Sequence, residues 1–192
     1  AQQSVSVLGA GLAGCEAAWQ LARRGIPVTL YEMKPQRYSP AHQSEDFAEL
    51  ICSNSLKAAR VDSAAGLLKE EMRRFGSLLI DCAEKSRVPA GGALAVDRKE
   101  FSRLATEAIQ SEPLIDINRE AVTDIPEGPV VVATGPLTSQ PLSEKILSLC
   151  GGGLSFFDAA APIVTRESLD MERCFAASRY GKGDQEGEEG DY

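Results

Sequence analysis

Three glycines near the start of the chain have the spacing of a phosphate-binding turn. In the pattern Gly-x-Gly-x-x-Gly, the first glycine permits a tight turn, the second lets a pyrophosphate approach the backbone, and the third allows the next helix to pack closely. The N-terminus of that helix adds free N–H groups and a positive dipole end for the phosphates. The pattern indicates dinucleotide binding, and its alternative is a glycine-rich turn in an unrelated α/β protein. The turn comprises Gly9, Ala10, Gly11, Leu12, Ala13 and Gly14.

The residues around this turn have the pattern strand, helix, strand. Residues 5–8 predict a short strand, small and apolar residues at helical spacing over 13–22 predict a helix, and "IPVTLYE" predicts a second strand that ends at Glu32. A carboxylate at that point can accept hydrogen bonds from ribose hydroxyls. Glu32 therefore favours a ligand with a free 2′-hydroxyl, which means FAD or NAD rather than NADP.

A long polar segment follows Glu32 before the next helical pattern begins. An NAD-binding domain usually continues promptly with further strand–helix units, whereas an excursion this long inside a domain is usually functional. FAD-binding domains of the glutathione-reductase type are interrupted in this way. The sequence therefore favours FAD, in a doubly wound, Rossmann-like α/β fold.

Later segments supply the rest of this fold. Apolar periodicity predicts one helix over 66–86, with Leu67, Leu68 and Phe75 on its buried face. Asp97 is expected to cap the next helix, and "PLSEKILSLC" is expected to form another. Predicted strands are "ALAV", "PLIDI", "EAVTDI", "PVVVATG", whose β-branched run indicates burial on both faces, and "LSFFDAAAPIV".

These elements suggest a domain plan. We expect an FAD-binding domain over residues 1–154 with an excursion at about 33–96, and the start of a second, substrate-side domain over 155–180. The last residues, 181–192, form an acidic, glycine-rich tail that cannot bury a core and is expected to be disordered.

Composition excludes several classes of protein. The net charge of −8 argues against non-specific nucleic-acid binding by the whole surface. The sequence has no long apolar run and no secretory signal pattern, so we expect no membrane span and a cytoplasmic location. Five cysteines at irregular spacing and a single histidine, His42, leave almost no ligands for a metal site, and Ser-His-Asp chemistry would depend wholly on His42.

One cysteine lies in an unusual loop. In "ELICSNSLKA", Cys52 precedes the polar residues Ser53, Asn54 and Ser55. Cys52 is either a reactive thiol, activated by a cation such as Lys57 or by a following helix N-terminus, or a small filler in a loop that lies against a flat ligand. The residues alone favour the filler.

Seven blocks that run nearly from end to end resemble one enzyme family. They are "GAGLAGCEAAWQLARRGIPVTLYEMKP", "PAHQSEDFAELICSNSLKA", "GLLKEEMRR", "VPAGGALAVDR", "VVATGPLTS", "FFDAAAPIV" and "SRYGKGD". The chain is similar to the folate- and FAD-dependent tRNA (uracil-5-)-methyltransferases, and "CSNSLKA" and "PAGGALAVDR" are much more specific than the glycine pattern. The resemblance implies an enzyme that uses FAD, 5,10-methylenetetrahydrofolate and NAD(P)H to methylate C5 of the T-loop uridine (uracil-54) of tRNA.

The resemblance also implies roles for particular residues. The glycine turn and Glu32 match FAD-binding positions, and Lys34 matches a basic position near the adenosine end. Val122 falls in a strand that approaches the adenine, and Cys52 matches a candidate catalytic cysteine near the isoalloxazine ring. The second flavin-contacting turn corresponds to Ala133, Thr134 and Gly135.

The chain differs from the family members in length. Members are more than twice as long as this chain, so it corresponds to their N-terminal portion, and the family's second implicated cysteine falls beyond Tyr192. Two alternatives stay open, a generic FAD-dependent oxidoreductase and a portion with no catalytic activity of its own. Basic residues that could contribute to a tRNA-binding patch are Arg37, Lys57, Arg60, Arg73, Arg74 and Arg98.

Overall fold

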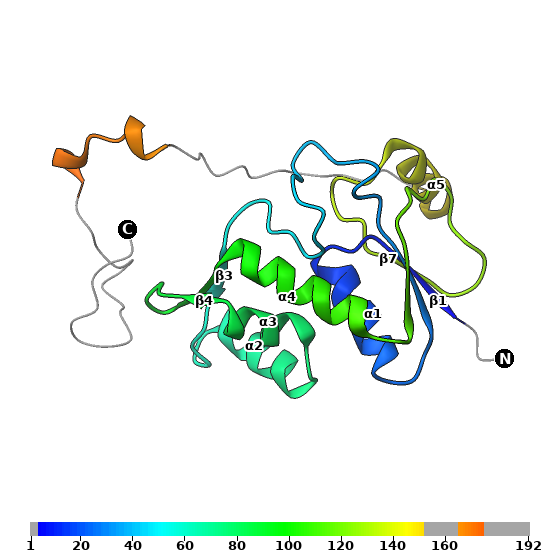
Figure 1. Ribbon diagram of the computed structural model, residues 1–192, viewed down its shortest axis with the longest axis horizontal. Coiled ribbons are helices and arrows are strands. Elements are labelled where there is room, and N and C mark those ends of the chain that lie inside the picture. Colours follow the sequence, from blue (N-terminus) through cyan, green and yellow to red (C-terminus); the bar gives the residue numbers. More distant parts are fainter. Residues whose placement is uncertain (1–3, 152–164, 175–192) are drawn as a thin grey trace.

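Four parallel strands form the central sheet, in the order β6-β2-β1-β7. Figure 1 shows the computed structural model of the chain, which describes residues 4–151 and 165–174. Because β2 and β7 lie on opposite sides of β1, the strand order reverses there, which confirms the predicted doubly wound α/β fold. The strands are β1 (Val5–Leu8), β2 (Val28–Tyr31), β6 (Ile115–Asn118) and β7 (Val130–Val132).

The first strand, helix and second strand form the predicted βαβ unit. Strand β1 leads through the glycine turn into α1 (Leu12–Ala22), and the chain returns as β2 with Val5 beside Val28 in parallel register. Val7 and Leu30 are fully buried between the sheet and the helices. This burial on a parallel sheet explains the apolar character of both strands.

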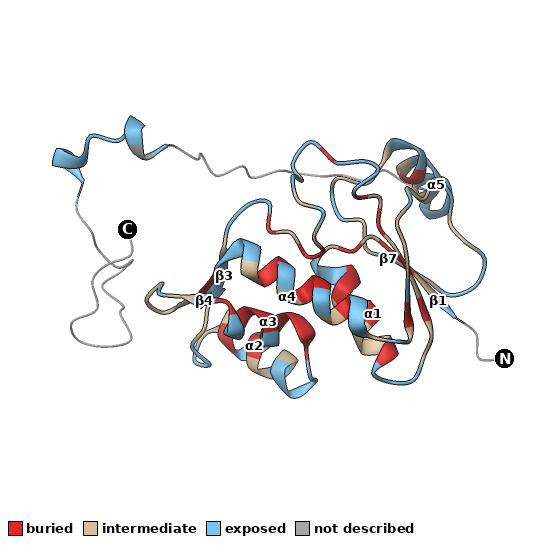
Figure 2. Cartoon of the chain, viewed as in Figure 1, coloured by how far each residue is buried: buried red, intermediate tan, exposed pale blue. Residues whose placement is uncertain are grey.

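Three helices that pack against one another form much of the core. Helix α1 packs on all four strands, and both α3 (Leu78–Lys85) and α4 (Arg98–Ser111) pack against α1. Figure 2 shows the buried sides of these helices turned toward each other. Asp97 caps α4 as predicted, because its carboxylate accepts a hydrogen bond of 2.9 Å from the Glu100 N–H.

The excursion contains a sheet of its own. Its three antiparallel strands have the order β3-β5-β4, with β5 in the centre. The segment predicted as a loop-like interruption is therefore partly a small second sheet, which lies beside α3. Its strands are β3 (Ser55–Ala58), β4 (Arg87–Val88) and β5 (Ala93–Val96).

The single helix predicted over 66–86 is wrong. The structure has two helices there, α2 (Ala64–Arg74) and α3, separated by a turn at Gly76. Gly76 adopts φ = +72°, and Ser77 starts α3 by accepting a hydrogen bond from the Ile80 N–H at 3.2 Å. A glycine in left-handed conformation followed by a capping serine ends one helix and begins another.

The break also changes which residues are buried. Leu67, Leu68 and Phe75, predicted on a buried face, are exposed, and Phe75 retains 73% of its accessible surface. The apolar pattern of this region continues into α3, where Leu78 and Cys82 are buried. One periodic pattern thus spans two helices with different surroundings.

Two strand predictions also need correction. Strand β7 lies at the edge of the central sheet as described, and Val132 is 43% exposed, so burial on both faces was wrong. The predicted strand "EAVTDI" is absent from the described structure, where residues 120–125 form a loop. The following helix, α5 (Gln140–Cys150), is present and ends at Gly151 in left-handed conformation, with φ = +66°.

The described chain ends in two short 3₁₀ turns, Arg166–Ser168 and Met171–Arg173. The strand predicted over 154–164 and the tail over 181–192 lie outside the described residues. Among the described helices, none has the length and apolar character needed to span a membrane.

A carboxylate on α1 holds the start of α3. Glu16 accepts hydrogen bonds from the Ser77 hydroxyl at 2.8 Å and from the Leu79 N–H at 3.1 Å, both through Oε2. A carboxylate at a helix N-terminus also interacts favourably with the helix dipole. Glu16 therefore links the βαβ unit to the excursion.

We predict that Glu16→Ala lowers the free energy of unfolding by about 1–2 kcal/mol, because two hydrogen bonds to a charged acceptor are lost. Chemical denaturation of the 192-residue chain measures the change. The matched control is Glu107→Ala, which removes an exposed ion pair with Arg103 and is expected to cost less than about 0.5 kcal/mol. Equal losses in the two variants would contradict the link.

Candidate functional site

A cavity of about 330 Å³ opens at the carboxyl ends of β1, β2 and β7. This is the place where doubly wound sheets bind their ligands, because the loops after neighbouring strands diverge there. The glycine turn forms one wall, the end of β2 and the excursion form a second, and the loop after β7 forms a third. The lining residues are 8–13, 31–34, 42, 49, 51, 120–122, 133–139 and 142.

Two glycines of the turn are required by the protein's own packing. Gly9 adopts φ = +95°, and a Cβ there would lie 2.9 Å from the Ala133 carbonyl oxygen. A Cβ on Gly14 would lie 1.7 Å from the Gly9 carbonyl oxygen. Any side chain at these positions would therefore force the turn away from α1 or from the loop after β7.

Gly11 is different. It has φ = −73°, which any residue adopts, and a Cβ there would meet nothing within 4 Å. Gly11 lines the cavity and is the N-cap of α1, whose first turn carries no acidic residue. No steric contact with the described residues requires a glycine at this N-cap, and its missing side chain leaves the cavity open beside the first N–H groups of α1.

Glu32 fixes the glycine turn to the end of β2. One carboxylate oxygen accepts a hydrogen bond from the Ala10 N–H at 2.9 Å, and the other accepts one from the Lys34 N–H at 3.0 Å. The residue is only 7% exposed, yet it lines the cavity. Each oxygen keeps a further lone pair for a ligand hydroxyl, so the predicted role of Glu32 is compatible with these bonds.

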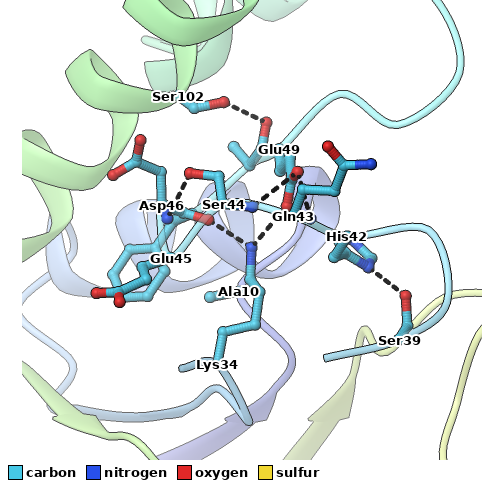
Figure 3. Close-up of polar contacts among 12 residues, drawn as sticks. Ala10, Lys34, Ser39, His42, Gln43, Ser44, Glu45, Asp46, Glu49 and Ser102 are labelled. Atoms are coloured by element: carbon cyan, nitrogen blue, oxygen red, sulfur yellow. Dashed lines mark hydrogen bonds and ion pairs between the residues drawn. The ribbon is translucent and has the colours of Figure 1, made fainter. Parts of the chain in front are cut away.

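Lys34 does not present a free ammonium to the cavity. Figure 3 shows its Nζ donating to the Asp46 carbonyl, at 2.6 Å, and pairing with the Glu49 carboxylate, at 3.2 Å. Lys34 is 4% exposed. Lys34 thus has a structural role in addition to the predicted contact with an adenosine, because its ammonium ties the end of β2 to the excursion.

Glu49 is the partner that this arrangement needs. Its other oxygen accepts hydrogen bonds from the Gln43 N–H at 2.9 Å and the Ser44 N–H at 3.1 Å (Figure 3). Burial alone would raise the pKa of Glu49, but these hydrogen bonds and the Lys34 ammonium more than offset it, so the pKa lies below its ordinary value. Glu49 stays ionised at neutral pH and holds the turn at residues 43–44 close to Lys34.

The loop after β7 supplies the third wall. Gly135 adopts φ = +66° and the Thr134 and Thr138 hydroxyls lie 2.6 Å apart. The Ala133 N–H donates to the Leu8 carbonyl at 2.8 Å, which keeps this loop against the glycine turn. The structure therefore brings the predicted 133–135 turn to the cavity, and Val122 also lines it, from a loop rather than from a strand.

His42 is a lining residue that sequence reasoning passed over as a ligand contact. Its Nδ1 lies 2.6 Å from the Ser39 hydroxyl, and its ring lines the cavity. Figure 3 shows the pair on the excursion, apart from the Lys34–Glu49 cluster. The available signal is a lone histidine in a turn of proline and polar residues, and the sequence predictions for His42 concern only a metal site and Ser-His-Asp chemistry.

Cys52 does not line the cavity. It is exposed and follows Ile51, the last residue of the excursion that does line it. The next element is strand β3 and not a helix. The predicted activation of the thiol by a following helix N-terminus therefore has no such helix to rely on. The cation that hydrogen-bonds to Cys52 is Arg98, whose Nη2 donates to the Cys52 carbonyl at 3.2 Å, whereas the predicted Lys57 lies on β3.

The buried cysteines are chemically distinct from Cys52. Burial, with a smaller contribution from Glu32, raises the pKa of the Cys15 thiol to about 12. Burial, with a smaller contribution from Asp81, raises the pKa of the Cys82 thiol to about 11. Both thiols stay protonated at neutral pH, as expected of core residues.

Comparison with known proteins identifies the family. The family described as glucose inhibited division protein A matches residues 4–189. The chain belongs to this family.

Relatives in the family carry the name that the sequence motifs indicated. The chain is 63% identical over 186 residues to methylenetetrahydrofolate–tRNA-(uracil-5-)-methyltransferase TrmFO of Desulforamulus reducens, covering 96% of this chain and 42% of the relative. It is 58% identical over 182 residues to the protein of the same name from Geobacter sulfurreducens, covering 94% of this chain and 42% of the relative. The predicted resemblance is confirmed, and the chain spans about two fifths of the length of these curated relatives.

A solved structure of the family supports the fold. Aquifex aeolicus GidA superimposes with a TM-score of 0.52 at 18% identity, over 65% of this chain and 20% of that chain. At this identity the likeness concerns the fold alone. It supports the Rossmann-like arrangement described above.

Three of the basic residues predicted for a tRNA-binding patch form ion pairs with nearby acids. Arg73 and Arg74 both form ion pairs with Glu70, and Arg60 forms one with Asp62. These residues of the predicted tRNA-binding patch thus have local partners. Within residues 4–151 and 165–174, no group of three histidine, cysteine or acidic side chains is arranged to hold a metal ion.

We predict that Glu49→Gln lowers stability by roughly 1–3 kcal/mol near neutral pH, because the buried Lys34 ammonium loses its charged partner. The folded-state pKa of Glu49 lies below the ordinary value of 4.5, so its contribution is complete above that pH and is lost as the pH falls through the folded pKa. The difference between wild type and variant should therefore shrink in acid.

Denaturant unfolding at a series of pH values measures this difference. The control is Glu45→Gln, an exposed neighbour whose side chain makes no hydrogen bond with the described residues. A wild-type-to-variant difference that stays constant below about pH 4.5 would contradict the assigned role of Glu49.

Proposed function

We propose that this chain binds FAD in the cavity at the carboxyl ends of the central strands. The glycine turn and the N-terminus of α1 would receive the pyrophosphate, and Glu32 would accept hydrogen bonds from the ribose hydroxyls. Lys34 and Val122 would flank the adenosine end. The second flavin contact would come from Ala133, Thr134 and Gly135.

The fit of the cavity to a dinucleotide rests on Gly11. Its missing side chain leaves open space beside the first N–H groups of α1, and no contact among the described residues accounts for that space. The absence of acidic residues in the first turn of α1 favours an anion there. Glu32, anchored by two backbone bonds, is already oriented for a ribose.

We further propose that the chain is the FAD-binding part of a folate-dependent tRNA (uracil-5-)-methyltransferase. The observation that carries this assignment is its 63% identity, over 96% of its length, to a relative of that name. The co-substrates would be 5,10-methylenetetrahydrofolate and NAD(P)H, and the nucleic-acid substrate would be the T-loop uridine of tRNA. When bound, FAD supplies the redox chemistry for transfer of a one-carbon unit. A tRNA substrate would agree with the cytoplasmic location expected from the sequence.

The chain's own residues have a limited set of tasks in this reaction. The three walls of the cavity bind and orient the cofactor, and Ile51 and Leu142 supply apolar surface that excludes water from it. Cys52 would act at the rim, as a nucleophilic thiol presented beside the cofactor site. Its exposure leaves room for a substrate to reach it.

We predict that Gly11→Ala and Gly14→Ala fail for different reasons. Gly11→Ala should keep the melting temperature of the apoprotein and weaken FAD binding by about 10-fold or more, because a methyl group would enter the space of the pyrophosphate. Gly14→Ala should lower the melting temperature sharply, because its Cβ would overlap the Gly9 carbonyl. Thermal unfolding and flavin fluorescence titration measure the two effects.

Each outcome of this pair is informative. An unchanged FAD affinity in Gly11→Ala would contradict the proposal that FAD binds in this cavity. A stable Gly14→Ala protein would show that the turn can move away from α1.

The reaction itself is tested on a longer protein. We would join this chain to the remaining part of the Desulforamulus reducens relative and measure transfer of the one-carbon unit to T-loop uridine in tRNA. Cys52→Ala should retain FAD absorbance and lose most methylation, whereas Cys150→Ala, at an exposed position on α5, should retain both. A joined protein that binds FAD and oxidises NAD(P)H but never methylates uridine would favour a generic flavin oxidoreductase.

A further inference from the structure

Helix α4 presents a row of three polar side chains to the segment that leads to Cys52. Arg98, Ser102 and Thr106 are spaced four residues apart, so they lie along one face of the helix. Each hydrogen-bonds to the backbone of the segment 47–52. Residues later in the segment meet residues earlier in the helix, so the two run in opposite directions.

The two buried members of the row hold the buried half of the segment. The Thr106 hydroxyl accepts from the Phe47 N–H at 2.8 Å and donates to the Ser102 carbonyl at 2.7 Å. The Ser102 hydroxyl donates to the Ala48 carbonyl at 3.4 Å, a contact drawn in Figure 3. Ser102 and Thr106 are 3% and 8% exposed, so their hydroxyls have no access to bulk water as an alternative partner.

The segment needs this support because its backbone is constrained at Ala48. Ala48 has φ = +51°, which is unfavourable for a residue with a side chain, and it is fully buried. Its N–H donates to the Ala10 carbonyl at 2.9 Å, within the glycine turn. The segment is thus held between the cofactor cavity and α4 before it reaches Cys52.

A second anchor lies just after Cys52. The Asn54 side chain donates to the Val96 carbonyl at 3.1 Å, and the Asn54 carbonyl accepts from the Val96 N–H at 3.0 Å. Cys52 lies between the anchors at Ala48 and Asn54, and its carbonyl accepts the hydrogen bond from Arg98. Arg98 is therefore the residue of α4 that contacts Cys52 directly.

We propose that Arg98 is a positioning residue for Cys52: its guanidinium fixes the Cys52 carbonyl, and so the placement of the thiol beside the cofactor cavity. The proposal rests on the function proposed above, in which Cys52 takes part in methylation. Ser102 and Thr106 secure the buried part of the same segment. A charged donor makes a stronger hydrogen bond to a carbonyl than a neutral donor would.

The exposure of Arg98 separates positioning from folding. Arg98 lies at the surface, where a single hydrogen bond contributes little to the stability of a protein. Its replacement should therefore leave the fold and the FAD site intact. Replacement of Ser102 or Thr106 would instead leave buried backbone groups without partners, and loss of function there would say nothing specific about Cys52.

The first test uses Arg98→Gln in the joined methyltransferase. We expect kcat for uridine methylation to fall by about 10- to 100-fold, because a small displacement of the thiol from the reacting atoms is enough to slow the reaction. The FAD content and the KM for tRNA should stay unchanged. Arg98→Lys should restore part of the rate, since an ammonium can still donate to the carbonyl. The control is Lys99→Gln, at the next position of α4, which is also exposed and should retain the wild-type rate.

The second test needs no cofactor or substrate. In the 192-residue chain, peptide mapping gives the rates at which iodoacetate and iodoacetamide alkylate each cysteine. A guanidinium bound to the Cys52 carbonyl attracts the anionic reagent, so the ratio of the two rates at Cys52 should fall by about 2-fold in Arg98→Gln and be kept in Arg98→Lys. The exposed Cys150 and Cys174 are internal controls whose ratios should not change.

The two tests separate this proposal from the proposed function. A joined protein in which Cys52→Ala is inactive while Arg98→Gln has a normal kcat overturns the positioning role, and so does an Arg98→Gln protein that loses FAD together with activity. If the wild-type joined protein binds FAD but never methylates, the proposed function fails. The alkylation test still decides the Arg98 contact in that case, because an unchanged ratio at Cys52 in Arg98→Gln would overturn it.

Discussion

The Glu32 carboxylate accepts hydrogen bonds from the N–H groups of Ala10 and Lys34, and the geometry of the site follows from this pair of bonds. They fix the glycine turn against the end of β2. Lys34 then carries the constraint outward, because its ammonium pairs with Glu49, which closes a turn of the excursion. The backbone hydrogen bond from Lys34 to Glu32 and the Lys34–Glu49 ion pair thus connect the end of β2 to a turn of the excursion, and the charge of Glu49 stabilises the buried Lys34 ammonium.

Local patterns predicted the elements whose physics is local. The βαβ unit follows from short-range signals: apolar alternation, three glycines and an acid at the end of β2. The cap at Asp97 and the helix at "PLSEKILSLC" are likewise decided within a few residues. These features were predicted correctly because no distant part of the chain has to be known to place them.

The errors arise where distant residues decide the outcome. The β-branched run of β7 is typical of a central strand, yet β7 lies at the edge of the described sheet, and strand order cannot be read from one strand. The apolar period over 66–86 continues through Gly76, whose left-handed backbone divides the helix. The pairing of Lys34 with Glu49 and the contact of Arg98 with Cys52 join residues far apart in sequence, so the candidate site could be predicted only as a set of residues and not as an arrangement.

The contrast between the glycines has a consequence for the descent of this domain. Gly9 and Gly14 are fixed by contacts within the polypeptide, whereas Gly11 borders open space. A descendant that stopped binding a nucleotide would still need the first and third glycines in order to fold, but selection would no longer keep the second. Among distant members of the same lineage, the residue at the Gly11 position would therefore separate domains that still carry a cofactor from domains that retain only the architecture.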